Sequence, residues 1–191
     1  MAQSSFNRPS LFILATGLVL FAGLALWFAT NFRRFDAVEA LDLPRTFVLG
    51  ALQSTEPVPG YPAIADLDQQ TTLNGEPFVV NFFASWCKGC AEEHANILAF
   101  DAANKGRVIG VVYEDTAEAA ARFLDKVRSP YLAVGVDADG VNAKNFAVSG
   151  LPETYIVLGD GTLFHRSVGP LTGERLDAFM EKWNLSKNAK I

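Results

Sequence analysis

The chain has 191 residues, of which 50% are hydrophobic, and its 21 acidic and 16 basic side chains give a net charge of −5. This length suits one domain of ordinary size with a small appendage, and it excludes a long repeat array or a large two-domain enzyme. The acidic balance argues against nucleic acid as a partner, because binding to phosphates needs a basic surface. Two cysteines form one bridge at most, so a disulfide-stapled miniprotein is excluded as well.

The N-terminal region differs sharply from the rest of the chain. Residues 11–30 are apolar at 16 of 20 positions, and no acidic residue precedes Asp36. About 20 helical residues at a rise of ~1.5 Å cross the ~30 Å hydrocarbon core of a bilayer. We therefore expect a short tail over residues 1–10 and an uncleaved transmembrane anchor over residues 11–32. A cleaved signal peptide fits less well, since its apolar stretch runs to only about 7–15 residues.

The positive charges that flank this anchor leave its orientation open. Arg8 precedes it, whereas Arg33, Arg34 and Arg45 follow it. Counted alone, these arginines would place the large domain in the cytoplasm.

The remainder of the chain is predicted to be a linker over residues 33–48 and one folded domain over residues 49–191. The segment after the anchor is rich in proline and has room for a short strand at 46–49. A regular alternation of strands and helices follows it. Apolar runs predict strands at 77–84, 107–113, 132–136, 154–158 and 163–168, and helical spacing predicts helices at 90–103, 116–127, 141–146 and 171–183. The turn residues 159–161 join the last two strands as a hairpin. This order predicts an α/β fold whose mixed sheet has a parallel portion and an antiparallel edge.

Both cysteines follow the first predicted strand, in the segment Ala84-Ser-Trp-Cys-Lys-Gly-Cys90. Functional sites of such sheets gather beyond the carboxyl ends of the strands. The N-terminus of a helix also stabilises a thiolate and lowers its pKa. Cys87, the outer cysteine, is therefore the expected nucleophile, and Cys90 is expected to resolve the mixed disulfide.

Three other interpretations of the cysteines remain open at this point. They could be buried structural residues, or half of a zinc site that His94 and His165 complete. A papain-like nucleophile is weaker, because His94 lies about 10 Å along the helix axis from Cys87.

Three motifs in order then carry a family resemblance. They are Phe82–Cys90 (FFASWCKGC) with Glu93-His94 after it, Gly110–Asp115 (GVVYED) and Ser149–Tyr155 (SGLPETY). Over roughly residues 73–176, together with the anchor, the sequence resembles the CcmG/DsbE family of membrane-anchored thioredoxin-like proteins of cytochrome c maturation.

This resemblance implies a thioredoxin-like fold with one transmembrane helix and no cofactor. It implies an N-terminus in the cytoplasm of a bacterium and a periplasmic domain attached to the inner membrane, which answers the question of orientation. The implied activity is reduction of the disulfide in the haem-binding C-x-x-C-H motif of apocytochrome c, or of a haem-ligation component that presents it. Electrons would come from a membrane thiol carrier of the DsbD/CcdA type.

The resemblance also assigns substrate-binding residues. Pro152 would be a cis-proline that faces the cysteine pair, and Leu151 would offer its backbone to an extended substrate. Trp86 would form part of the contact surface. Taken alone, a Leu-Pro bond is cis in only about 5% of cases, so an ordinary proline at the start of a strand is the alternative for Pro152.

Charged residues near the cysteines are expected to tune their pKa. By resemblance, Glu93 and Glu153 disfavour a thiolate, whereas the positive charge of Lys88 should by itself favour one. Solvated positions on a helix face and in a turn are the alternatives for Glu93 and Glu153. Asp115 matches the family's acidic segment, but the pattern Asp115–Glu118 is also typical of a helix cap.

The two histidines carry less information. Packing or capping is the favoured interpretation of His94, and His165 has no motif support.

The dipeptide between the cysteines departs from the family pattern, which usually has a proline there. Lys88-Gly89 replaces it, and Gly89 is expected to loosen the first helical turn. We expect the protein to remain a reductant, but a less extreme one.

Two other functions stay in view. One is reduction of a different envelope target, such as a copper-site protein. The other is a redox-inactive chaperone of haem or apocytochrome that keeps the fold without the chemistry.

Overall fold

In the computed structural model of the chain, residues 52, 55–67, 75–104 and 106–189 are described. The predicted anchor (11–32), linker (33–48), short strand at 46–49 and domain boundary at residue 49 lie outside them. Within the described residues, no helix is both long enough and apolar enough to span a bilayer.

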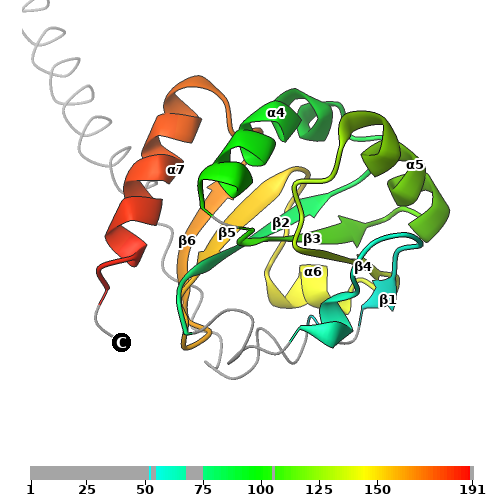
Figure 1. Ribbon diagram of the computed structural model, residues 1–191, viewed down its shortest axis with the longest axis horizontal. Helices are drawn as coiled ribbons and strands as arrows, with labels where there is room; N and C mark the ends of the chain where they lie inside the picture. The colour runs from blue at the N-terminus through cyan, green and yellow to red at the C-terminus, as the bar shows by residue number, and fades with distance from the viewer. Residues whose placement is uncertain (1–51, 53–54, 68–74, 105, 190–191) are drawn as a thin grey trace, which may run out of the picture. The chain divides into compact units, whose positions relative to one another are not determined.

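A six-stranded mixed sheet forms the centre of the domain, in the order β1-β4-β3-β2-β5-β6 (Figure 1). Its strands are β1 (Glu56–Pro57), β2 (Phe78–Phe83), β3 (Val108–Tyr113), β4 (Ala133–Asp137), β5 (Glu153–Val157) and β6 (Leu163–Val168). Strands β2, β3 and β4 are parallel, whereas β5, β6 and β1 are each antiparallel to their neighbours. The predicted parallel portion with an antiparallel edge is confirmed.

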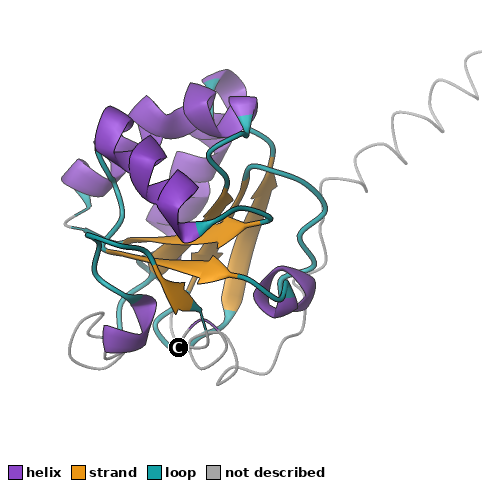
Figure 2. Ribbon diagram, turned by 90° about the vertical axis from the view of Figure 1, so that its right-hand side faces the viewer, coloured by secondary structure: helices purple, strands orange, loops and turns teal. Residues whose placement is uncertain are grey.

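Helices cover both faces of this sheet. They are η1 (Ile64–Asp66), α4 (Lys88–Ala103), α5 (Ala117–Val127), α6 (Val141–Asn145) and α7 (Gly173–Ser186). Helices α4, α5 and α7 lie on one face, and α6 with η1 lies on the other (Figure 1). Figure 2 shows the same separation from the side. We call these the α4 face and the α6 face.

Strand β2 explains why the domain has two apolar layers. All six of its residues are buried, and their side chains alternate between the two faces. Val79 and Phe83 pack in the core of the α4 face, while Val80 and Phe82 pack in that of the α6 face. A strand covered on both sides needs a nearly continuous apolar sequence, as its FVVNFF run provides. The carboxyl end of β2 leads directly to the cysteines.

The predicted strands and helices are present, and their ends differ from the prediction by at most three residues. Helix α4 begins at Lys88, two residues early, because Cys87 caps it. Strand β1 and helix η1 were not predicted. Both are short, and they lie in the proline-rich segment whose composition indicates irregular structure.

Candidate active site

The cysteine pair lies where β2 passes into α4. Cys87 is the N-cap of α4 and forms a disulfide with Cys90, in the first helical turn. The backbone N–H of Cys90 donates a hydrogen bond to Sγ of Cys87 at 3.1 Å. Both residues are buried, with 6% and 3% of their surface exposed. When the pair is reduced, this N–H and the helix terminus stabilise a thiolate at Cys87.

The loop between β3 and α5 is hydrogen-bonded to the residues that directly precede Cys87. The indole Nε1–H of Trp86 donates to the carbonyl of Glu114 at 2.9 Å, although 58% of Trp86 is exposed. The N–H of Ser85 donates to Oδ2 of Asp115 at 2.6 Å. The alternative of a helix cap at Asp115 is wrong, because Thr116 is the N-cap of α5. Asp115 instead links the two loops at this end of the sheet.

The loop before β5 lies against the cysteine segment. The Leu151–Pro152 peptide bond is cis, as the resemblance implies. A Cβ atom added to Gly89 would lie 3.0 Å from Cδ of Pro152, so Pro152 packs directly on the dipeptide between the cysteines. The carbonyl of Pro152 accepts from the N–H of Gly169 at 2.9 Å. The N–H and C=O of Leu151 have no hydrogen-bond partner in the part of the chain that the structure describes.

Glu93 is buried on the α4 face, one turn along α4 from Cys90. Its Oε2 accepts from the N–H of Leu171 at 2.8 Å, and its Oε1 accepts from Nδ2 of Asn81 at 2.9 Å. Burial raises the pKa of Glu93 to about 7, and these two hydrogen bonds oppose the rise. Glu93 therefore changes protonation state near neutral pH, beside the buried cysteine.

Sequence reasoning missed the polar network behind Glu93. Asn81, in the middle of β2, donates its second Nδ2 hydrogen to Oγ1 of Thr154 at 2.9 Å. Its Oδ1 accepts from the hydroxyl of Tyr131 at 2.7 Å. Burial, and then the charge of Glu93, raises the pKa of Tyr131 well above its usual value, so it stays a hydroxyl donor. The signal for this network was one polar residue inside the apolar run FVVNFF.

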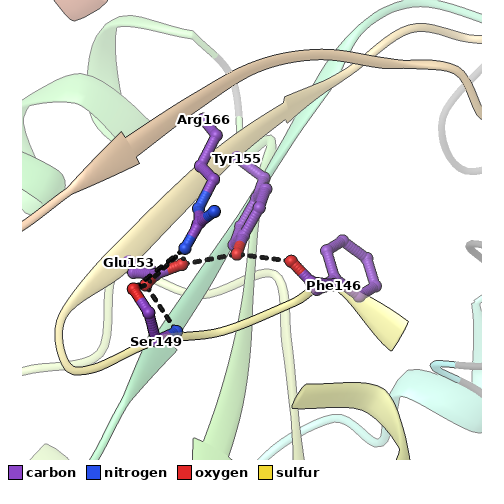
Figure 3. Close-up of polar contacts among 5 residues, drawn as sticks. All are labelled: Phe146, Ser149, Glu153, Tyr155 and Arg166. Atoms are coloured by element: carbon purple, nitrogen blue, oxygen red, sulfur yellow. Dashed lines mark hydrogen bonds and ion pairs between the residues drawn. The ribbon is translucent and has the colours of Figure 1, made fainter. Parts of the chain in front are cut away.

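Glu153 lies on the α6 face, across the sheet from Glu93. It is completely buried, and it alternates with Thr154, whose hydroxyl points to Asn81 on the α4 face. Figure 3 shows its carboxylate between Arg166, Ser149 and the hydroxyl of Tyr155. Tyr155 lies 2.5 Å from Oε2 of Glu153 and 2.8 Å from the carbonyl of Phe146, so its one hydroxyl proton is shared between two acceptors.

The environment of Glu153 keeps it ionised. Burial alone would raise its pKa, but hydrogen bonds from Arg166, Ser149 and Tyr155 outweigh burial, and the net shift is downward. The fork of Arg166 binds both carboxylate oxygens, at 2.9 and 3.0 Å. This geometry directs Glu153 to the loop of Pro152 and away from the sulfur atoms.

The remaining candidates lie at the margin of the site. Nζ of Lys88 is 3.7 Å from Glu92, and the Lys88 side chain is 92% exposed, so its charge is well solvated. Nε2 of His94 hydrogen-bonds to the carbonyl of Arg128 at 2.7 Å. His165 packs near Phe179. Among the described residues, no group of three or more His, Cys, Asp or Glu side chains is placed to hold a metal ion.

Comparison with known proteins agrees with this geometry. The Redoxin family model matches residues 62–180, more than half of the chain, and this segment includes both cysteines. The thiol:disulfide interchange protein DsbE of Yersinia pestis is 30% identical over 175 residues, which cover 88% of each chain. CycY of Rhizobium leguminosarum is 36% identical over 125 residues, 63% of this chain and 65% of that relative, so this match spans less than two thirds of CycY.

Solved structures agree on the fold. A crystal structure of a DsbE-type thiol:disulfide interchange protein from Chlorobium tepidum has a TM-score of 0.54 and 20% sequence identity. It covers 69% of this chain and 96% of the other. The thioredoxin-like fold is confirmed.

Fold, paired cysteines and relatives together define a thiol–disulfide oxidoreductase. Within that class, the chain belongs to the Redoxin family and to its CcmG/DsbE group of thiol:disulfide interchange proteins.

Proposed function

We propose that the protein is a periplasmic reductase, anchored in the bacterial inner membrane by residues 11–32. Its substrate is the disulfide of the C-x-x-C-H motif of apocytochrome c, or of a haem-ligation component that presents it. One observation carries this proposal: the Cys87–Cys90 pair packs beside Pro152, next to the backbone of Leu151, whose N–H and C=O have no hydrogen-bond partner among the described residues. An extended segment pairs with such a backbone through main-chain hydrogen bonds. Exposed Trp86 adds an apolar contact surface.

The proposed reaction starts from the reduced pair. The Cys87 thiolate attacks one sulfur of the substrate disulfide, which forms a mixed disulfide and releases a substrate thiolate. Cys90 then loses its proton and attacks the Cys87 sulfur, so the protein disulfide forms and the second substrate thiolate leaves. The two substrate sulfurs take up two protons. In total, two electrons pass from the protein to the substrate; Cys90 releases one of the two protons, and the other comes from solvent, because Cys87 reacts as a thiolate.

Glu93 is suited to the second step. Cys90 is buried and must lose a proton before it can attack, and a base acts best when its pKa lies near the working pH. With a pKa of about 7, Glu93 accepts protons at neutral pH from a position one turn along α4. The Asn81 amide holds its carboxylate in place.

Each cycle must end with reduction of the Cys87–Cys90 disulfide. This step consumes two electrons and two protons from a dithiol donor. We assign that role to a membrane thiol carrier of the DsbD/CcdA type, which would deliver electrons on the periplasmic side.

A trapping experiment tests the substrate. In cells that express the full-length Cys90→Ala protein, attack by Cys87 cannot be resolved, and the mixed disulfide accumulates. We expect a thiol-sensitive adduct with apocytochrome c or a haem-ligation component, and none in the matched Cys87→Ser/Cys90→Ala control. Adducts with unrelated envelope proteins alone would contradict the proposed substrate. Normal cytochrome c maturation in a Cys87→Ser strain would instead favour a redox-inactive chaperone.

A further inference from the structure

The Glu153 carboxylate lies on the α6 face, and its hydrogen bonds to Ser149 connect the two ends of the loop that faces the cysteines. We propose that Arg166 is a positioning residue that, through Glu153 and Ser149, holds the main chain of Leu151 ready to bind an extended substrate. This inference rests on the proposed function, because it concerns substrate binding at the same site.

One carboxylate fixes both ends of this loop. Glu153 directly follows Pro152 in the chain. Its Oε1 also accepts from the backbone N–H of Ser149 at 2.8 Å and from the Ser149 hydroxyl at 2.6 Å. Ser149 lies two residues before Leu151. The loop from Ser149 to Glu153 is therefore closed by hydrogen bonds to a single side chain.

Arg166 in turn fixes that carboxylate. It lies on β6, where it pairs with Tyr155 of the neighbouring strand β5. Its Nε donates to Oε2 of Glu153, and its Nη2 donates to Oε1, in the bidentate geometry that only a guanidinium provides. Nη2 also lies 3.0 Å from the Ser149 hydroxyl oxygen. Arg166 thus reaches both the carboxylate and the loop residue that it holds.

Without this cation, the loop would lose its support. A buried carboxylate that has lost its only ion pair among the described residues must take up a proton or admit water. Either change weakens the acceptor that Ser149 uses twice. Leu151 would then sample more conformations, so an extended substrate would lose main-chain hydrogen bonds. A small disulfide, which needs only the sulfur atoms, would be unaffected.

Steady-state reduction by the full-length protein in detergent micelles tests this inference, with dithiothreitol as the dithiol that restores the Cys87–Cys90 pair and its uncatalysed rate subtracted. The probes are a synthetic peptide with a Cys-Ala-Ala-Cys-His disulfide, a peptide of scrambled sequence with the same ring, and bis(2-hydroxyethyl) disulfide. In Arg166→Gln, we expect KM for both peptides to rise about ten-fold, equivalent to the loss of one ordinary hydrogen bond. Turnover of each peptide, and the rate with the small disulfide, should stay within about two-fold of wild type.

Two variants and one direct readout complete the test. Arg166→Lys keeps the positive charge but not the bidentate guanidinium geometry, so its KM should lie between the values of wild type and Arg166→Gln. This variant replaces Arg166→Gln in the test if Arg166→Gln does not fold. Arg122→Gln, an exposed arginine of α5, is the charge-matched control and should leave KM unchanged. Hydrogen exchange at the Ser149 amide should be faster in both Arg166 variants.

The outcomes separate this inference from the proposed function. An unchanged KM in both Arg166 variants, or an equal loss with the small disulfide, would overturn the positioning role. If wild type reduces the scrambled peptide as well as the Cys-Ala-Ala-Cys-His peptide, the proposed substrate preference fails. Even in that case, the KM of the Arg166 variants for the scrambled peptide, divided by the KM of wild type, still tests the positioning role of Arg166.

Discussion

Glu93 and Glu153 are two buried carboxylates on opposite faces of one sheet, and their environments give them opposite properties. Among the described residues, Glu93 accepts hydrogen bonds from neutral groups alone, and burial raises its pKa to about 7. Glu153 is at least as buried, but Arg166, Ser149 and Tyr155 bring its pKa below the usual value. Burial alone therefore does not decide the charge of a carboxylate here; the hydrogen bonds that it accepts, first of all those from the Arg166 guanidinium, decide it.

Because of this difference, the two carboxylates suit different roles at the site. A group with a pKa near 7 exchanges protons at neutral pH, which suits Glu93 to the step that needs Cys90 deprotonated. A group that is ionised at neutral pH and binds a guanidinium and a loop suits positioning, which is the role that we propose for Glu153.

The largest effect should come from removing the cation of the pair. Arg166→Leu leaves Glu153 buried and unpaired, so we expect a loss of about 3 to 5 kcal/mol in the free energy of unfolding at pH 7. Urea denaturation measures it, and Arg122→Leu, on the exposed side of α5, should cost less than about 0.5 kcal/mol.

The pH dependence of this effect has a defined sign. The folded-state pKa of Glu153 is lowered, so the stability from its ionised form is present above the unfolded pKa and lost as pH falls through the folded pKa. The difference between Arg166→Leu and wild type should shrink in acid. A difference that stays constant down to about pH 2 would contradict the assigned ionisation of Glu153.

Glu93 should show the opposite dependence. Its folded-state pKa of about 7 exceeds the ordinary value of 4.5, so the folded protein binds the proton more tightly. Stability should fall as pH rises from about 4.5 to about 7, by about 3 kcal/mol in total. Glu93→Gln should lack this part of the slope. Parallel pH profiles for the variant and wild type, from urea denaturation, would show that Glu93 is not shifted.

Asp115 offers a carboxylate outside the core for comparison. It is only partly buried, and it accepts hydrogen bonds from the N–H groups of Ser85 and Thr116. Asp115→Asn keeps one acceptor, so we expect a loss of about 1 kcal/mol in thermal or urea unfolding. Glu118→Gln is the exposed control and should change stability by less than about 0.5 kcal/mol. If Asp115→Asn lowered the free energy of unfolding as much as Arg166→Leu does, the expected difference between buried and partly buried carboxylates would be contradicted.

The smallest effect is expected from Lys88, the exposed charge that lies between the two cysteines in the chain. Proline suits the first position of α4, and the backbone of Cys87, with φ −78° and ψ 111°, tolerates a following proline. In glutathione buffers, Lys88→Pro should shift the equilibrium about two-fold toward the disulfide, because the solvated Lys88 charge stabilises the thiolate only slightly. Lys88→Ala separates charge from backbone rigidity. A ten-fold shift in Lys88→Ala would show that the exposed charge matters more than the structure indicates.

Much of the fold and the cysteine site could be predicted from local sequence. Apolar runs revealed the long strands, because a strand covered on both faces cannot carry many polar residues. The cysteine site could be predicted because both cysteines come directly after the first of these strands. Strand β1 escaped prediction, because two residues, one of them a proline, show no periodicity.

The opposite pKa shifts of Glu93 and Glu153 could not be predicted from the sequence, because they depend on contacts with residues far apart in the chain. Strand β5 was predicted to begin at Thr154 and begins at Glu153, so the sequence left a turn position open as the alternative for Glu153. With the correct start, alternation would have placed Glu153 and Thr154 on opposite faces. One of the three hydrogen-bond partners of Asn81 is Tyr131, 50 residues away, and no local pattern links the two.

The most direct test of this account is the titration of the two carboxyl groups themselves. Carbon NMR of full-length protein labelled at glutamate Cδ would follow each midpoint, with Glu93→Gln and Glu153→Gln to assign the signals. The account predicts a midpoint near 7 for Glu93 and a midpoint below 4.5 for Glu153. Two midpoints near 4.5, or the reverse order, would contradict it.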